Sequence, residues 1–123
     1  MRYDPSVGPD PTAWLDLGEG GQLKTVLRDH EREEADEGSF RMHAVIHATV
    51  ETQLAQGHEN ASAALARLLE GGLDRHDSVH AIGRVLATQI FQAMQGEEFD
   101  GDEYNRDLDE LTPESWQRMA EED

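Results

Sequence analysis

The sequence contains no cysteine, few basic residues, few aromatic residues and no long apolar run. The lack of cysteine excludes disulfides, thiolate catalysis and metal sites with sulfur ligands. No apolar stretch approaches the ~20 residues that a membrane-spanning helix needs, and no basic start leads into an apolar stretch. Hydrophobic residues make up 37% of the 123 residues, which predicts one modest core. We therefore expect a small cytoplasmic domain without a signal peptide or membrane contact.

Acidic residues dominate the charge of the chain. The sequence has 27 Asp and Glu against 10 Lys and Arg, a formal charge of −17, which disfavours binding to a nucleic-acid backbone. Residues 1–38 carry a net −6, residues 39–96 a net −1 and residues 97–123 a net −10. The nearly neutral middle third also holds most of the apolar residues, so we expect the core there. The acidic ends either solvate the protein or dock a basic protein partner.

Apolar residues recur at helical spacing, and no segment alternates as a strand would. The sequence thus predicts an all-α fold, a small bundle of about five helices with short connections. We expect an extended arm over residues 1–12, a helical core domain over 13–95 and an acidic C-terminal segment with a short final helix over 96–123. The main helices are expected at about 22–34, 40–56, 61–70 and 75–95, and the last one opens at Pro113.

Several residues predict where these helices begin and end. Asp74 is a candidate N-cap, with Asp77 three residues later as in a capping box. Gly72 lies where a left-handed C-cap is expected, and Asn60 is a second candidate N-cap. Trp14, in a short helical turn that glycines 18, 20 and 21 are expected to interrupt, is the predicted anchor of the arm onto the core.

Four of the six histidines are paired at a spacing of four residues. His43 and His47 lie on one predicted helix, with Glu51 another four residues on, and His76 and His80 lie on a second. Residues four apart share one face of a helix, so each pair can converge on one point. Two imidazoles presented in this way are typical of divalent transition-metal sites. The helix N-terminus also disfavours a charged His76, which favours ligation.

Topology suggests how the pairs could meet. If short loops join antiparallel neighbours, the two paired helices run parallel and their N-terminal ends lie together. His30, at the end of the preceding helix, would lie at the same end, whereas His58 would not. The predicted ligands are His43, His47, His76 and His80, followed by Glu51 and His30, for zinc, iron, manganese or nickel. No glycine-rich phosphate loop is present, so we expect no nucleotide cofactor.

Other interpretations of the histidines stay open. A histidine at the border of a core commonly bonds a carbonyl or a carboxylate, which would make the cluster a structural polar network. Catalysis without a metal and a pH-responsive assembly are further alternatives. The run from His76 to His80 is similar to the zinc-protease pattern HExxH, but Asp77 is a methylene shorter than the general base glutamate. The sequence therefore leaves enzymatic activity undecided, and it leaves a homodimer open.

Two segments carry a family resemblance. Residues 42–54 contain HxxxHxxxExQL, and residues 73–83 read LDRHDSVHAIG. Together with Trp14-Leu15 they resemble a family of small bacterial helical proteins known as a domain of unknown function. The resemblance covers residues 11–95 and departs at Asp77, where the family pattern has Glu. It implies that the four paired histidines are a family feature, and it implies no activity or substrate. The alternative function is a non-enzymatic acidic interaction domain with a structural histidine cluster.

Overall fold

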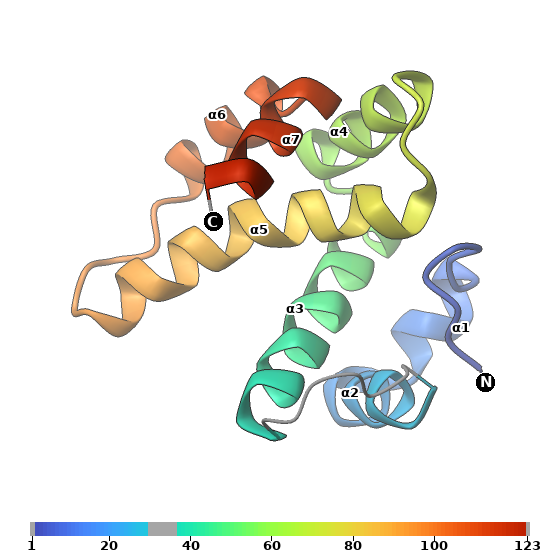
Figure 1. Cartoon of the computed structure of the whole chain (residues 1–123). Helices are drawn as coiled ribbons and strands as arrows, with labels where there is room; N and C mark the ends of the chain where they lie inside the picture. The colour runs from blue at the N-terminus through green and yellow to red at the C-terminus, as the bar shows by residue number, and fades with distance from the viewer. Residues whose placement is uncertain (1, 30–36, 123) are drawn as a thin grey trace. The chain divides into compact units, whose positions relative to one another are not determined.

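The computed structural model describes residues 2–29 and 37–122, and its regular elements are helices (Figure 1). The described residues form α1 (Pro11–Asp16), α2 (Gly18–Asp29), α3 (Glu37–Ala55), α4 (Glu59–Glu70), α5 (Arg75–Met94), α6 (Gly101–Glu110) and α7 (Pro113–Glu122). The prediction of an all-α fold is confirmed. A single bundle of about five helices is not confirmed, because these helices belong to two compact units, Met1–His58 and Glu59–Asp123. None of the described helices is both long enough and apolar enough to cross a bilayer.

In the first unit, α1 and α2 both pack against α3 (Figure 1). The unit has its own apolar cluster, which joins the N-terminal segment to all three helices. Its buried members are Tyr3, Trp14, Val26, Ala44 and Ala48. Trp14 is completely buried, which confirms its predicted role as an anchor. Tyr3, in the segment before α1, is therefore part of the core of this unit, and the expected extended arm over residues 1–12 instead contains a turn at residues 5–7 and the start of α1 at Pro11.

The boundary between α1 and α2 differs from the prediction. Only Gly18, with a φ of +71°, marks the break between the two helices. Gly20 and Gly21 lie inside α2, so the prediction that they interrupt the chain is wrong. A Cβ atom at position 21 would lie 3.1 Å from Cβ of Leu17, a tight approach. Glycine costs helical stability by its flexibility but permits this close packing.

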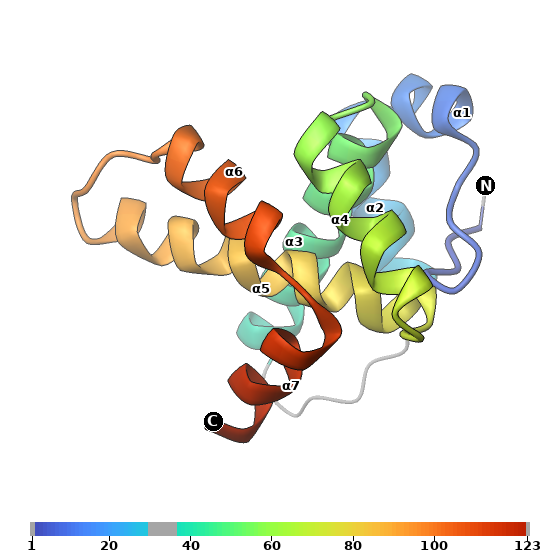
Figure 2. The ribbon, with the colours of Figure 1, turned by 90° about the horizontal axis from the view of Figure 1, so that it is seen from above.

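In the second unit, α4 packs against α5 and α6, and α5 packs against α6 (Figure 2). The acidic α6 contributes Tyr104 and Leu108, both almost completely buried. Arg67 on α4 fastens the end of α6, because its Nε donates to the carbonyl of Leu111 at 2.9 Å and its Nη2 to the carbonyl of Leu108 at 2.6 Å. Residues 101–111 of the acidic C-terminal segment are thus folded onto this unit. The three-part division expected from the sequence stays a prediction.

Two of the predicted helix ends are confirmed and one is wrong. The carboxylate of Asp74 accepts from the backbone N–H of Asp77 at 2.8 Å, as an N-cap does. Gly72 has a φ of +101°, as expected of a left-handed C-cap. Asn60, however, lies within α4 and donates from its side-chain amide to the carboxylate of Asp109 at 2.8 Å. This contact to α6 draws its side chain away from the helix terminus.

The start of α7 lies directly against the end of α4. Thr112 and Ser115 form a reciprocal cap, in which each hydroxyl accepts from the backbone N–H of the other at 3.1 and 2.9 Å. Pro113 opens the helix and faces Gly71. A Cβ atom on Gly71 would lie 2.5 Å from Cγ of Pro113. The absence of a side chain at position 71 therefore allows α7 to begin where it does.

Replacing Gly71 by Ala should lower the stability of the second unit. The added methyl group would overlap the ring of Pro113, which cannot rotate away, and overpacking of this kind costs about 1–3 kcal/mol. Urea denaturation followed by circular dichroism measures the loss. Gly20→Ala is the matched control, because nothing lies within 4 Å of a Cβ atom there. It should leave stability unchanged or raise it by about 0.5–1 kcal/mol. Equal stability of Gly71→Ala and the wild type would contradict the contact.

One carboxyl group of α6 has a shifted pKa. Partial burial raises the pKa of Asp107 above its ordinary value of 3.8, and the carboxylates of Glu103 and Glu110 raise it further. Arg106 opposes this shift in part. A raised pKa means that the fold favours the protonated form, so the charged form of Asp107 destabilises the unit at neutral pH. That cost disappears as the pH falls through the pKa of the folded state and then below 3.8.

Asp107→Asn should therefore raise the melting temperature at pH 7. The gain should shrink as the pH is lowered and vanish near pH 3, because both forms are then neutral at this position. Thermal melts of the variant and the wild type across this pH range measure the difference. Asp102→Asn is the control on the same helix, since Asp102 is exposed in the first turn and its charge favours the helix dipole. A gain for Asp107→Asn that does not change with pH would refute the electrostatic origin.

Candidate functional site

The first histidine pair lies on α3 as its spacing predicts. The ring centroids of His43 and His47 are 4.7 Å apart and tilted by 50°. One ring nitrogen of each histidine lies within 4.8 Å of the other, a separation that one metal ion can bridge with small rotamer changes. His47 is only 2% exposed, whereas His43 is half-buried. The pair therefore presents one fixed and one more accessible imidazole.

A buried hydrogen-bonded triad holds His47. The hydroxyl of Tyr3 lies 2.9 Å from Nδ1 of His47 and 2.8 Å from Oε2 of Glu51. All three side chains are at most 3% exposed. The ring of Tyr3 also packs edge-on against His47, with a centroid distance of 5.9 Å, and in a tilted arrangement against Trp14, with a centroid distance of 5.8 Å. Burial of a carboxyl and an imidazole is costly without such partners, so the triad compensates for it.

The hydrogen bonds of the triad assign its protons. Tyr3 carries a single hydroxyl proton and donates it to the carboxylate of Glu51. The bond to His47 then requires Nδ1 to be the donor and the tyrosine oxygen the acceptor. In a neutral imidazole this leaves the lone pair on Nε2. The triad therefore selects the tautomer of His47 in which Nε2 is the nitrogen suited to a metal.

A turn in the N-terminal segment places Tyr3. The carbonyl of Asp4 accepts from the backbone N–H groups of Val7 and Gly8, and its carboxylate accepts from the N–H of Ser6. Gly8 has a φ of +84°, which favours glycine at the end of this turn. The sequence analysis missed Tyr3 as part of the site, because its partners lie 44 and 48 residues away. Pattern spacing along one helix carries no signal of such a contact.

The second histidine pair lies on α5. The ring centroids of His76 and His80 are 4.6 Å apart in an edge-to-face arrangement, and both side chains are half-buried. His76 lies in the first turn of α5, directly after the N-cap formed by Asp74. Each predicted pair is thus formed within its own helix.

The remaining predicted site residues have different outcomes. Glu51 lies in the same unit as His43 and His47, with Oε2 bonded to Tyr3. His30 lies outside the described residues. His58 follows α3, with its N–H bonded to the carbonyl of Gln53, at the opposite end of that helix from His43. The convergence of the two pairs on one ion concerns residues of both units and stays a prediction.

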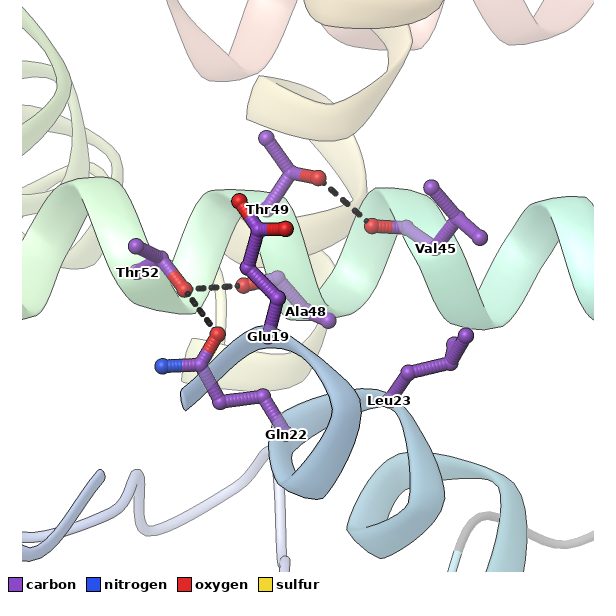
Figure 3. A pocket seen from close by; sticks show the side chains of 7 residues that line it. All are labelled: Glu19, Gln22, Leu23, Val45, Ala48, Thr49 and Thr52. Atoms are coloured by element: carbon purple, nitrogen blue, oxygen red, sulfur yellow. Dashed lines mark hydrogen bonds between the residues drawn. The ribbon is translucent and has the colours of Figure 1, made fainter. Parts of the chain in front are cut away.

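A groove of about 370 Å³ lies between α2 and α3 (Figure 3). It is lined by Glu19, Gln22, Leu23, Val45, Ala48, Thr49 and Thr52. The hydroxyl of Thr52 lies 3.1 Å from Oε1 of Gln22 and 2.9 Å from the carbonyl of Ala48, and it accepts from Nε1 of Trp14 at 3.1 Å. The hydroxyl of Thr52 and the side-chain oxygen of Gln22 are therefore engaged within the protein, and the carboxylate of Glu19 also lines the groove.

Comparison with known proteins adds no relative. No family model, curated protein or solved structure matches this chain. The resemblance of residues 11–95 to a family of helical bacterial domains therefore stays a prediction, and the site rests on its own geometry.

Tyr3→Phe tests whether the triad stabilises the first unit. The change removes one hydroxyl that bonds two buried polar groups, and it should lower the free energy of unfolding by about 1–3 kcal/mol. Chemical denaturation measures the loss. Thr49→Val is the control on α3, because the hydroxyl of Thr49 donates to the carbonyl of Val45 in its own helix and the side chain is only half-buried. It should cost clearly less. Equal effects of the two substitutions would show that the triad adds nothing.

Proposed function

We propose that this protein is a helical domain that binds a divalent transition metal, zinc, iron, manganese or nickel, through its two His-xxx-His helices. The observation that carries the proposal is the pair on α3, in which the rings of His43 and His47 lie 4.7 Å apart and His47 is buried and oriented. His76 and His80 on α5 repeat the arrangement at 4.6 Å. Four imidazoles match the ligand preference of these metals. A cytoplasmic location is part of the same proposal.

The triad around His47 supports this role. Histidines that ligate metals generally donate their other ring N–H to an oxygen, which fixes the tautomer and the ring plane. Nδ1 of His47 has such an acceptor in the hydroxyl of Tyr3, and Tyr3 is held in turn by Glu51. Nε2 is then the ligating atom of His47. Glu51 acts as the carboxylate that strengthens the ligand through its hydrogen bond to Tyr3, and the sequence also predicts Glu51 as a further ligand.

The charge of the chain favours cations in general. With a formal charge of −17, the protein attracts divalent ions electrostatically and raises their concentration near its surface. Surface attraction alone does not select one ion over another, whereas imidazole ligands favour transition metals over magnesium or calcium. The proposal therefore includes selectivity. We propose no reaction for this site.

Metal analysis of protein purified without a polyhistidine tag or chelator tests the proposal. We expect about one transition-metal ion per chain, and a higher melting temperature in its presence. His43→Ala and His76→Ala should each weaken zinc affinity by about tenfold or more, measured by competition with a chromophoric chelator. His58→Ala is the matched control and should bind as the wild type does.

The outcomes separate the two roles of the histidines. No bound metal and no thermal shift with any of the four ions would refute the metal site and leave the structural network. Loss of affinity with His43→Ala but not with His76→Ala would restrict the site to α3. Tyr3→Phe should reduce zinc affinity even after its lower stability is allowed for, since the orienting acceptor is gone.

The structural network is the second candidate, and the same triad favours it. The bonds from Tyr3 to His47 and Glu51 satisfy buried polar groups whether or not an ion is bound. In that case, variants of His47 would lose stability to the same extent with and without added metal.

A further inference from the structure

The last turn of α5 and the loop that follows it expose three large apolar side chains within nine residues. Phe91 is 59% exposed, Met94 67% and Phe99 48%. The other large apolar side chains exposed in the described part of the chain are Val7, Leu15, Met42 and Leu69, which are scattered along it. Single exposed apolar residues are ordinary, but a group of them marks an interaction surface more often than chance. We call Phe91, Met94 and Phe99 the apolar corner.

The apolar corner is held in place by the rest of the second unit. Phe91 and Met94 are three residues apart on α5 and share one face of that helix. The loop that follows is tied back to α5, because the N–H of Glu97 donates to the carbonyl of Gln92 and the N–H of Asp100 donates to the buried side chain of Gln89. The ring of Phe99 packs against Tyr104 with a centroid distance of 5.8 Å. The exposed side chains are therefore presented on an organised backbone.

Carboxylates are concentrated at and after this corner in sequence, whereas the nearest basic residues are Arg84 and Arg106. Residues 85–105 contain five acidic residues and no Lys or Arg. They are Glu97, Glu98, Asp100, Asp102 and Glu103. Charge complementarity then requires a partner that carries positive charge beside an apolar face. A second copy of this chain would bring the same carboxylates together, and phosphate groups of a membrane or nucleic acid would be repelled.

We propose that the apolar corner and its flanking carboxylates dock a basic amphipathic helix of a partner protein. In such a complex, the apolar stripe of the partner helix covers Phe91, Met94 and Phe99. Lysine or arginine side chains beside the stripe then face Glu97 and Glu98. The apolar contacts supply most of the affinity and the carboxylates supply orientation and speed of association. This surface is separate from the histidine pairs and does not depend on metal binding.

A labelled synthetic peptide tests this surface on the full-length protein. The probe is a helix of about 18 residues with leucine on one face and lysine on the other, about 27 Å long. A scrambled peptide of the same composition, without an apolar face, controls for charge alone. Fluorescence anisotropy should show that the wild type binds the amphipathic peptide at least about tenfold more tightly than the scrambled one.

Two variants and one control assign the contact. Phe91→Ser combined with Met94→Ser should weaken amphipathic-peptide binding by about tenfold or more. Leu69→Ser removes an exposed apolar side chain elsewhere in the same unit and should not change it. Glu97→Gln combined with Glu98→Gln should reduce the salt dependence of binding. Circular dichroism confirms that each variant folds, which is expected because these side chains are exposed.

Three results would overturn the proposal. The first is no binding of the amphipathic peptide to the wild type. The second is equal binding of the scrambled peptide, which would reduce the interaction to net charge. The third is unchanged binding by the folded variant that lacks Phe91 and Met94, which would place the contact elsewhere.

Discussion

The hydroxyl of Tyr3 joins two side chains that would be expensive to bury alone. His47 and Glu51 both lie in the interior of the first unit, and each is within 2.9 Å of that single oxygen. The contact also fixes the N-terminal segment, because the ring of Tyr3 belongs to the same cluster as Trp14. Local structure, core packing and the orientation of the candidate ligand therefore depend on one residue that precedes the first helix.

In the second unit, the main constraint is the electrostatic repulsion within an acidic segment. Residues 97–123 carry a net charge of −10, yet α6 buries Tyr104 and Leu108 against its neighbours. Its charges face outward, and the cationic side chain of Arg67 binds the carbonyls at the end of the helix. Repulsion between carboxylates still destabilises this helix at Asp107, since burial and two neighbouring carboxylates raise the pKa of its side chain. Such crowding of carboxylates is tolerated because the apolar side of the helix is well covered.

The sequence predicts best where the signal is local. The N-cap at Asp74, the left-handed Gly72 and the pairing of histidines within each helix all follow from spacings of a few residues, and the structure contains them. Predictions fail where long-range packing decides. Asn60, predicted as an N-cap, instead bonds Asp109 on another helix, 49 residues away. The partners of Tyr3 could not be found for the same reason. The failure at glycines 20 and 21 is of another kind, because α2 simply continues through both residues although glycine is a poor helix former.

The two proposals concern different kinds of residues in different places, and they are therefore independent. One depends on buried polar side chains and the other on exposed apolar side chains. Metal binding depends on imidazoles whose protons are positioned by a buried hydrogen-bond network, so we expect substitutions in the interior around His47 to change metal affinity most. Docking of a basic helix depends on exposed apolar side chains beside carboxylates, so we expect substitutions at the surface around Phe91 to change peptide affinity most. A substitution that disturbs the interior should change stability and metal affinity together, whereas one at the surface should change neither. The negative charge of the chain favours both kinds of binding, because it attracts divalent cations and basic peptides alike. Selectivity then comes from the imidazoles for a metal ion and from the exposed apolar side chains for a peptide.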